Sequence, residues 1–169
     1  MLISKYEYPT LRRETQTNGK RQYVGDDSIP VPSVTTVLSE TGDKTALIAW
    51  RKRVGDAEAT RISTEAAGLG TKVHNAIEKY ILQEEWDTFG NNHVSILAKT
   101  MTTMMVENGL NKIDELWGVE VGLIAEGLYA GTSDAIGMYE GEEAIIDFKT
   151  SKKSLTVVIV SPPILYGTP

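Results

Sequence analysis

The chain of 169 residues contains no cysteine. This absence excludes a disulfide framework, a thiolate-ligated zinc site and a cysteine nucleophile. The sequence also lacks an apolar run long enough to cross a bilayer, and it opens without a signal peptide, so we expect a cytoplasmic protein that does not contact membranes. A surplus of basic residues is missing too. The net charge of −6 argues against broad electrostatic binding to nucleic acid, although it leaves room for a local basic groove.

The composition is that of a globular protein, with 41% hydrophobic and 24% charged residues. The length suffices for one domain with a substantial core. We expect an α/β fold in a single domain, 1–169, in which a mostly helical N-terminal half precedes a small mixed sheet. The expected parts are a hairpin and linker over 1–32, a helical part over 33–113, a β-sheet over 114–153 and a tail over 154–169.

Local turn and capping signals place the first elements. Asn18-Gly19 predicts the turn of a polar hairpin over residues 5–24. Ser33 predicts the N-cap of a short helix that runs through Leu38. Apolar periodicity predicts further helices over 45–54, 56–85 and 93–113, and alternation predicts a strand over 117–123.

Residues 130–153 organise the rest of the chain, because they predict two strands joined by a short turn. Asp134 lies on the first strand, and Asp147 and Lys149 lie on the second. Side chains alternate along a strand, so Asp147 and Lys149 share one face while Ile146 and Phe148 share the other.

The pairing of these strands lets Asp134 approach Asp147 across the ladder. Two carboxylates in apolar surroundings repel each other unless a cation lies between them. A hard divalent ion, Mg²⁺ or Mn²⁺, suits such oxygen ligands. The alternative is a salt bridge between Asp147 and Lys149 on a solvated sheet face.

Two motifs in this stretch, GTSDAIG at 131–137 and IIDFKTSKK at 145–153, resemble the metal site of the PD-(D/E)XK nucleases. The similarity is greatest to the RecB-like branch, among phage-type exonucleases related to the mitochondrial genome-maintenance exonuclease. PSVTTVL at 32–38 and GTKVHNAIEKYI at 70–81 also resemble that family. The resemblance runs from about Tyr23 to Lys153.

The resemblance implies a restriction-endonuclease-like core and metal-dependent hydrolysis of DNA from an end, in phage DNA replication, recombination or repair. The expected partner is a DNA end, single-stranded in particular. It implies that Asp134 and Asp147 bind Mg²⁺ or Mn²⁺ together with His74 and the main-chain carbonyl of Phe148. Lys149 would then act on the transition state. A glutamate at the place of Glu120 also belongs to the catalytic site of such enzymes.

Two of these residues also have simpler interpretations. His74 lies beside an apolar helical stripe, where a histidine is usually a core residue. Glu120 lies on the predicted strand, where it would project opposite Val119 and Val121 into solvent. Gly68 and Gly70 predict a break before His74, or a close approach of that helix to the sheet.

Basic residues supply candidate DNA contacts. Arg51, Lys52 and Arg53 form the densest basic cluster, and Lys152 and Lys153 follow the Asp-x-Lys motif. Each group would bind phosphate. The alternative for the first cluster is a solvated helix end, where the helix dipole favours cations.

The C-terminal stretch departs from the family pattern, because no glutamine follows Gln83 and a Gln-x-x-x-Tyr helix is therefore missing. We expect a truncated or diverged relative whose sheet face, including Ile146 and Phe148, is uncovered and drives self-association. The run TVVIV at 156–160 would pair with another chain. The alternative function is a catalytically inactive DNA-binding or assembly module that retains a nuclease core.

Overall fold

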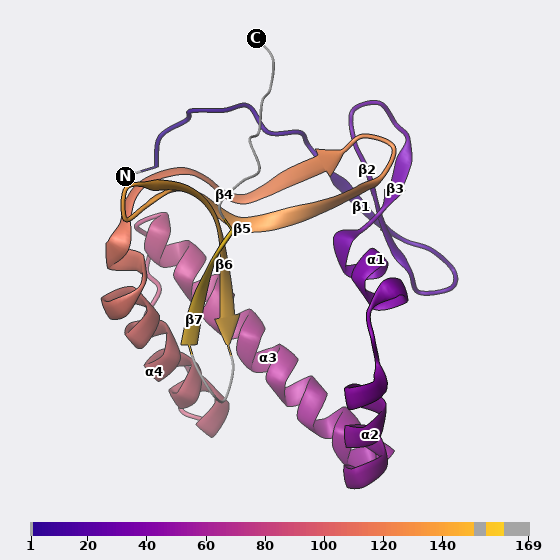
Figure 1. The fold of residues 1–169 in the computed structure, drawn as a ribbon. Coiled ribbons are helices and arrows are strands. Elements are labelled where there is room, and N and C mark those ends of the chain that lie inside the picture. Colours follow the sequence, from indigo (N-terminus) through magenta and orange to yellow (C-terminus); the bar gives the residue numbers. More distant parts are fainter. Residues whose placement is uncertain (1, 151–154, 161–169) are drawn as a thin grey trace. The chain divides into compact units, whose positions relative to one another are not determined.

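The computed structural model describes residues 2–150 and 155–160, and it confirms a mixed α/β protein. The chain forms two compact units. The first unit comprises Met1–Tyr6, Ile62–Glu120 and Asp134–Pro169, and the second comprises Glu7–Arg61 and Val121–Ser133. Among the described residues, no helix is both long and apolar enough to span a membrane. Figure 1 follows the elements along the chain.

The second unit contains a three-stranded antiparallel sheet in the order β1-β2-β3. Its strands are β1 (Arg12–Thr15), β2 (Arg21–Val24) and β3 (Pro30–Pro32). The predicted hairpin is confirmed, since Thr15 pairs with Arg21 and the intervening loop contains Gly19 at a φ of +79°. Tyr23, Val31 and Ala130 form a small core in this unit.

Two short helices follow in the second unit. The predicted cap is confirmed, because the Ser33 hydroxyl accepts from the Thr36 N–H at 3.0 Å at the start of α1 (Val34–Thr41). The helix ends three residues beyond the predicted Leu38. Helix α2 (Thr45–Val54) has the predicted bounds, but neither helix contains a buried residue. The apolar side chains of α2 therefore remain largely in solvent, as Ile48 does at 62% exposure.

Most of helix α3 (Asp56–Ile81) belongs to the first unit, and its 26 residues are continuous. The predicted break at Gly68 and Gly70 is wrong. Each glycine costs a helix about 1 kcal/mol relative to alanine, and packing outweighs this cost because Val73 and Ile77 in the following turns are fully buried.

Helix α4 (His93–Asn108) is capped by Asn92, whose side-chain oxygen accepts from the Ser95 N–H at 2.9 Å. It ends at Asn108 with Gly109 as its C-cap, short of the predicted end at 113, and a 3₁₀ turn, η1 (Leu110–Lys112), leads into the sheet. Met101 and Met105 are buried in the core, whereas Met104 is 48% exposed. Two of these three methionines therefore fill the core.

A four-stranded sheet has the order β4-β5-β6-β7. Its strands are β4 (Ile113–Ala125), β5 (Tyr129–Tyr139), β6 (Glu142–Thr150) and β7 (Leu155–Val160). Strands β5 and β6 are antiparallel, with Ala135 opposite Ile146, and Glu140 and Gly141 form the predicted turn at φ values of +50° and +84°. Two positive φ values at these positions are typical of a type I′ hairpin turn. Strand β7 pairs antiparallel with β6, so the TVVIV run extends its own sheet.

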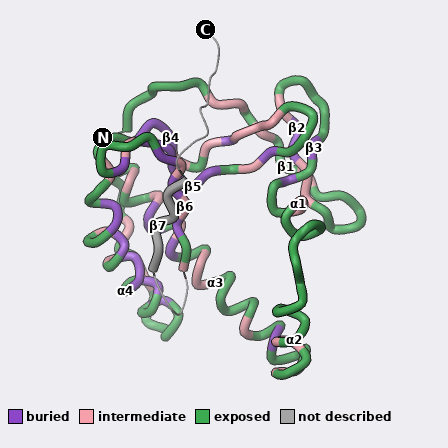
Figure 2. The backbone as a smooth tube through the Cα atoms, in the orientation of Figure 1, coloured by how far each residue is buried: buried purple, intermediate pink, exposed green. Residues whose placement is uncertain are grey.

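The main core lies on the sheet face that α3 and α4 cover. Ile146 and Phe148 are only 0% and 3% exposed, and they belong to one cluster with Val73, Ile77 and other residues of α3, α4 and the sheet. Figure 2 shows buried positions along α4 and the strands. The expectation that this face is uncovered is wrong, because helices that precede the sheet in sequence pack against it.

Candidate metal centre

Three side chains of the first unit converge beside the middle of β5. His74 comes from α3, Glu120 from β4 and Asp134 from β5. Each offers one ligand atom, and these atoms lie within 4.8 Å of one another. Within the described part of the chain, this cluster brings together three of the residues that the sequence predicted for the site.

His74 is held by its two ring nitrogens. Nε2 lies 2.6 Å from the carbonyl oxygen of Phe148, and Nδ1 lies 3.5 Å from Oδ1 of Asp134. A carbonyl oxygen only accepts hydrogen bonds, so Nε2 carries a proton and Nδ1 faces the carboxylate. The Asp134 carboxylate raises the pKa of His74, and this effect outweighs the opposing effect of burial. His74 is therefore not surrounded by apolar side chains alone, and its role as a metal ligand stays a prediction.

Asp134 is fixed from the other side by a main-chain group. Its Oδ2 accepts a hydrogen bond from the Phe148 N–H at 2.7 Å. Burial favours the neutral carboxyl, but the His74 imidazole and the Phe148 N–H favour the carboxylate more strongly, so the pKa of Asp134 is lowered. The main chain of Phe148 thus orients both partners, through its carbonyl oxygen for His74 and its N–H for Asp134.

Glu120 adopts an unusual backbone conformation. Its φ is +50°, in the left-handed region, within strand β4. A residue with a Cβ adopts this conformation at a cost of about 1–2 kcal/mol, and such outliers gather at functional sites. The regular alternation that the sequence predicted for Val119, Glu120 and Val121 is interrupted here. The strand pattern in the sequence did not predict the left-handed backbone at Glu120.

The charge environment of Glu120 is unfavourable to a carboxylate. Although the residue as a whole is exposed, partial desolvation raises the pKa of Glu120, and repulsion from Asp134 and Glu78 raises it further. His74 partly offsets these effects. A cation between the two carboxylates would relieve their repulsion.

The three side chains are of the kinds that bind divalent ions, and one separation between them suits such an ion. Ions such as Mg²⁺ lie about 2.1 Å from their ligand atoms, so two ligands of one ion are separated by about 3.0–4.2 Å. The separation of 3.5 Å between Nδ1 of His74 and Oδ1 of Asp134 falls in this range. The whole cluster, at up to 4.8 Å, would contract slightly around an ion. Two carboxylates suit Mg²⁺ or Mn²⁺, and the imidazole favours a transition metal.

Asp147 and Lys149 occupy the two positions beside Phe148 on β6. The Lys149 ammonium lies 2.6 Å from Oδ2 and 2.8 Å from Oδ1 of Asp147, and their side chains are 61% and 36% exposed. The predicted alternation is confirmed, because both residues flank buried Phe148. Asp147 is outside the three-residue cluster among the described residues. Its role as a direct ligand stays a prediction, and the structure records the ion pair with Lys149.

The main-chain carbonyl of Phe148, a predicted ligand, accepts from His74 instead. A carbonyl has two lone pairs, so this contact leaves one acceptor direction for an ion. Nearby, an added Cβ at Gly70 would lie 3.4 Å from the Thr150 hydroxyl, whereas one at Gly68 would have no atom within 4 Å. Of the two glycines expected to permit a close approach of helix and sheet, only Gly70 faces β6.

The predicted DNA-binding residues are not part of this cluster. Arg51, Lys52 and Arg53 end α2 in the second unit, and the Arg51 guanidinium pairs with Asp56 at 3.0 Å. A helix C-terminus is a favourable place for cations, so the simpler interpretation accounts for their position. Lys152 and Lys153 lie outside the described residues, as does the tail 161–169.

Comparison with known proteins adds no identification. No family model matches the chain. No curated protein is significantly similar to it in sequence. The chemistry of the site must therefore be argued from its own residues.

Proposed function

We propose that this protein is a divalent-metal-dependent deoxyribonuclease that hydrolyses phosphodiester bonds. The observation that carries the proposal is the convergence of His74, Glu120 and Asp134 beside a strand that bears Asp147 and Lys149. The main chain of Phe148 orients His74 and Asp134. A nuclease of this kind needs carboxylate and imidazole ligands for the metal and an exposed cationic side chain nearby. The three-residue cluster supplies the ligands, and Lys149 supplies the cation.

His74, Glu120 and Asp134 would hold Mg²⁺ or Mn²⁺, with Asp147 and the Phe148 carbonyl as further ligands. The bound ion supplies Lewis-acid stabilisation of the phosphate and activates water for attack. Lys149, which is 61% exposed, would stabilise the negative charge that develops on the phosphoryl oxygens. Asp147 holds the Lys149 ammonium in place until a phosphate competes for it. The Nε2–H bond to Phe148 fixes the tautomer of His74, so that Nδ1 offers its lone pair to the ion.

The resemblance to RecB-like phage exonucleases supports action at DNA ends, in phage DNA replication, recombination or repair. A second candidate is an inactive DNA-binding or assembly module. It is favoured by two contacts: Asp147 and Lys149 satisfy each other, and the Phe148 carbonyl accepts from His74. In this second case the cluster would be a structural hydrogen-bond network.

The two candidates differ in turnover. Single- and double-stranded DNA, labelled at either the 5′ or the 3′ end, is incubated with the protein in Mg²⁺, Mn²⁺ or EDTA. The nuclease proposal predicts products with metal, none with EDTA and none with Asp134→Asn. Glu78→Gln is a matched control, because Glu78 acts on Glu120 only by repulsion and should retain activity. Absence of metal-dependent products from the folded wild-type protein would refute the proposal.

A further inference from the structure

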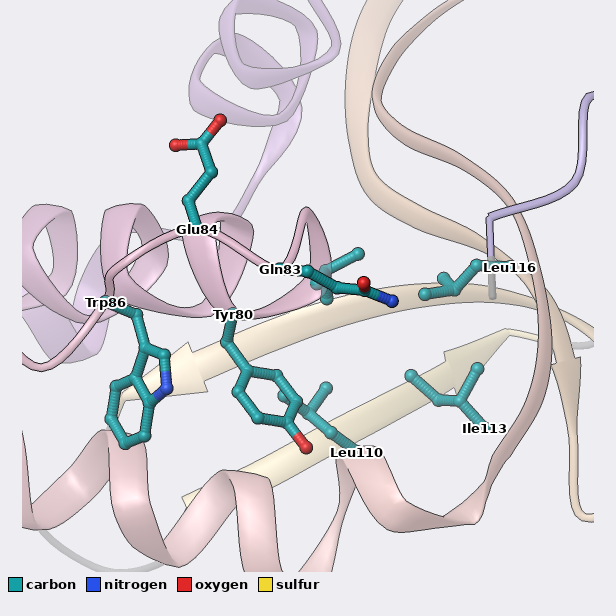
Figure 3. Close-up of a pocket in the computed structure, with 8 residues that line it drawn as sticks. Tyr80, Gln83, Glu84, Trp86, Leu110, Ile113 and Leu116 are labelled. Atoms are coloured by element: carbon teal, nitrogen blue, oxygen red, sulfur yellow. The ribbon is translucent and has the colours of Figure 1, made fainter.

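A second site lies in the first unit, at the C-terminal end of α3. A cavity of about 420 Å³ opens there, within the size range of small-ligand pockets. Tyr80 and Trp86 line it, with ring centroids 5.8 Å apart and planes at 90°. Leu110 and Leu116 add apolar surface. Figure 3 shows the two aromatic rings side by side and the Gln83 side chain extending towards Leu116.

Gln83 occupies a backbone position that normally belongs to glycine. Its φ is +60°, and two hydrogen bonds close the helix end around it. The Gln83 N–H donates to the carbonyl of Tyr80 at 3.1 Å, and the Glu84 N–H donates to that of Lys79 at 2.8 Å. This pair of bonds is a Schellman motif, whose left-handed residue is usually glycine. A glutamine at this position incurs strain but places an amide at the cavity, and strain of this kind points to function.

The chemistry of the cavity matches a flat, uncharged ring with a hydrogen-bonding edge. Aromatic side chains stack on bases, and a glutamine amide pairs with the donor and acceptor on one edge of adenine. Of the described residues that line the cavity, none is basic, so it does not suit a phosphate. The acidic side chain of Glu84 points away from the two rings and from Gln83 (Figure 3).

The cavity shares its elements with the metal centre. Tyr80 follows His74 by six residues on α3, which is about 9 Å along the helix. Leu116 precedes Glu120 by four residues on β4, which is about 13 Å along an extended strand. Stacked bases rise 3.4 Å each. A few nucleotides therefore separate a base in the cavity from a phosphate at the metal centre.

We infer that this cavity binds an unpaired nucleobase of the DNA strand whose phosphate reaches the metal centre. The inference rests on the proposed function and adds to it a preference for single-stranded DNA. Because the two ring planes are perpendicular, one ring would stack on the base and the other would pack edge-on against it, and Gln83 would hydrogen-bond the base edge. Phosphates would remain outside the cavity.

Binding and cleavage are measured separately to test this inference. The probes are a fluorescein-labelled 12-nucleotide oligo(dA) and an abasic oligomer of equal length, and affinity is measured by fluorescence anisotropy in EDTA. The wild type should prefer oligo(dA). Trp86→Leu and Tyr80→Leu should weaken oligo(dA) binding by about 5- to 150-fold, the range for loss of one stacked base, and leave abasic binding unchanged. Tyr129→Leu is the matched control, because this exposed tyrosine lies in the second unit.

Gln83→Gly provides a variant whose folding is not in question. Glycine relaxes the left-handed backbone, so thermal stability should rise while oligo(dA) affinity falls by about 2- to 13-fold, the range for one hydrogen bond. Equal affinity of wild type and all three cavity variants for oligo(dA) would overturn the inference, even if DNA is cleaved in Mn²⁺. The opposite combination is also informative. If the variants lose oligo(dA) affinity but the wild type cleaves no DNA with any metal, base binding in the cavity is supported and only the nuclease proposal is refuted.

Discussion

Removal of the Asp134 charge should destabilise the metal-free protein in weak acid but hardly in base. In Asp134→Asn, the amide oxygen still accepts from the Phe148 N–H, so the change removes mainly the attraction to protonated His74. The relevant contact is the 3.5 Å separation between Nδ1 of His74 and Oδ1 of Asp134. Stability should therefore respond to pH differently in the variant and in the wild type.

The direction follows from the two pKa shifts. The pKa of His74 is raised above its usual 6.5, so the stabilisation is complete below pH 6.5 and is lost as the pH rises through the folded-state pKa. The pKa of Asp134 is lowered below its usual 3.8. Its contribution is present above pH 3.8 and is lost as the pH falls through the folded-state pKa. The pair therefore stabilises the fold most between about pH 4 and 6.5.

The magnitude follows from the exposure of the pair. Hydrogen bonds to charged groups contribute about 1.5–3 kcal/mol, but the side chains of His74 and Asp134 are 30% and 15% exposed. Solvent screening reduces the expected loss to about 1–2 kcal/mol at pH 5.5. The attraction disappears as the pH rises through the folded-state pKa of His74, and the variant also loses repulsion with Glu120. At pH 9 the change should therefore stay within about 0.5 kcal/mol.

Urea unfolding in EDTA at pH 5.5 and pH 9 measures both values. With a slope of about 2 kcal/mol per molar urea, the midpoint at pH 5.5 should fall by about 0.5–1 M. Asp147→Asn is the control, because the exposed ion pair of Asp147 with Lys149 contributes little to stability. An equal loss of stability for Asp134→Asn at both pH values would refute the assigned protonation of His74.

Four further outcomes are expected. Glu120→Gly should stabilise the metal-free protein by about 1 kcal/mol, because glycine relaxes the left-handed backbone. The same change should weaken Mn²⁺ binding at least about tenfold in calorimetric titration. Ser28→Gly is the control: Ser28 has a φ of +60° and lies far from the cluster in sequence, so this variant should gain stability without changing Mn²⁺ affinity. Lys149→Ala should abolish turnover and leave Mn²⁺ affinity largely intact, so a calorimetric loss of metal binding would contradict its role. Mn²⁺ should bind about tenfold more tightly than Mg²⁺, since Mg²⁺ prefers oxygen ligands to imidazole, and equal titration curves would count against a histidine ligand. Gly137→Ala should lower the free energy of unfolding, measured in urea, by about 3 kcal/mol or more, because the added Cβ would overlap a main-chain oxygen of β4. Gly68→Ala places its Cβ in open space and should raise the free energy of unfolding by about 1 kcal/mol.

Local signals predicted most secondary structure because they act over a few residues. The Ser33 cap and the Glu140-Gly141 turn each need only a short stretch of chain. The break at Gly68 and Gly70 was wrong for the opposite reason. Whether a glycine interrupts a helix depends on packing of the flanking turns, which residues distant in sequence decide.

The covering of the sheet shows the same limit at larger scale. Alternation predicted that Ile146 and Phe148 share a face, but no local pattern states what packs on that face. In the structure, α3 and α4 cover it. The expectation of an uncovered face arose from a comparison of the C-terminal stretch with the family pattern, and it left out the helices that come earlier in the chain.

The candidate site was predictable in its residue types and less so in its contacts. Motif resemblance singled out His74, Asp134 and Asp147, and the structure places His74 against Asp134. The double role of the Phe148 main chain could not be predicted, because any residue offers a carbonyl and an N–H. Only the three-dimensional arrangement reveals that one peptide segment orients two side chains.

The two proposed sites share one backbone feature, a non-glycine residue in the left-handed region. Four non-glycine residues of the described chain have positive φ: Ser28, Gln83, Glu120 and Glu140. Ser28 and Glu140 lie in tight turns, where this conformation is ordinary. Glu120 instead lies within a strand and Gln83 at a helix end where glycine is usual. Glycine would relax either position, yet it would remove the carboxylate from the cluster or the amide from the cavity. Strain that is retained where a polar side chain reaches a candidate site is what selection for binding, rather than for stability, would leave.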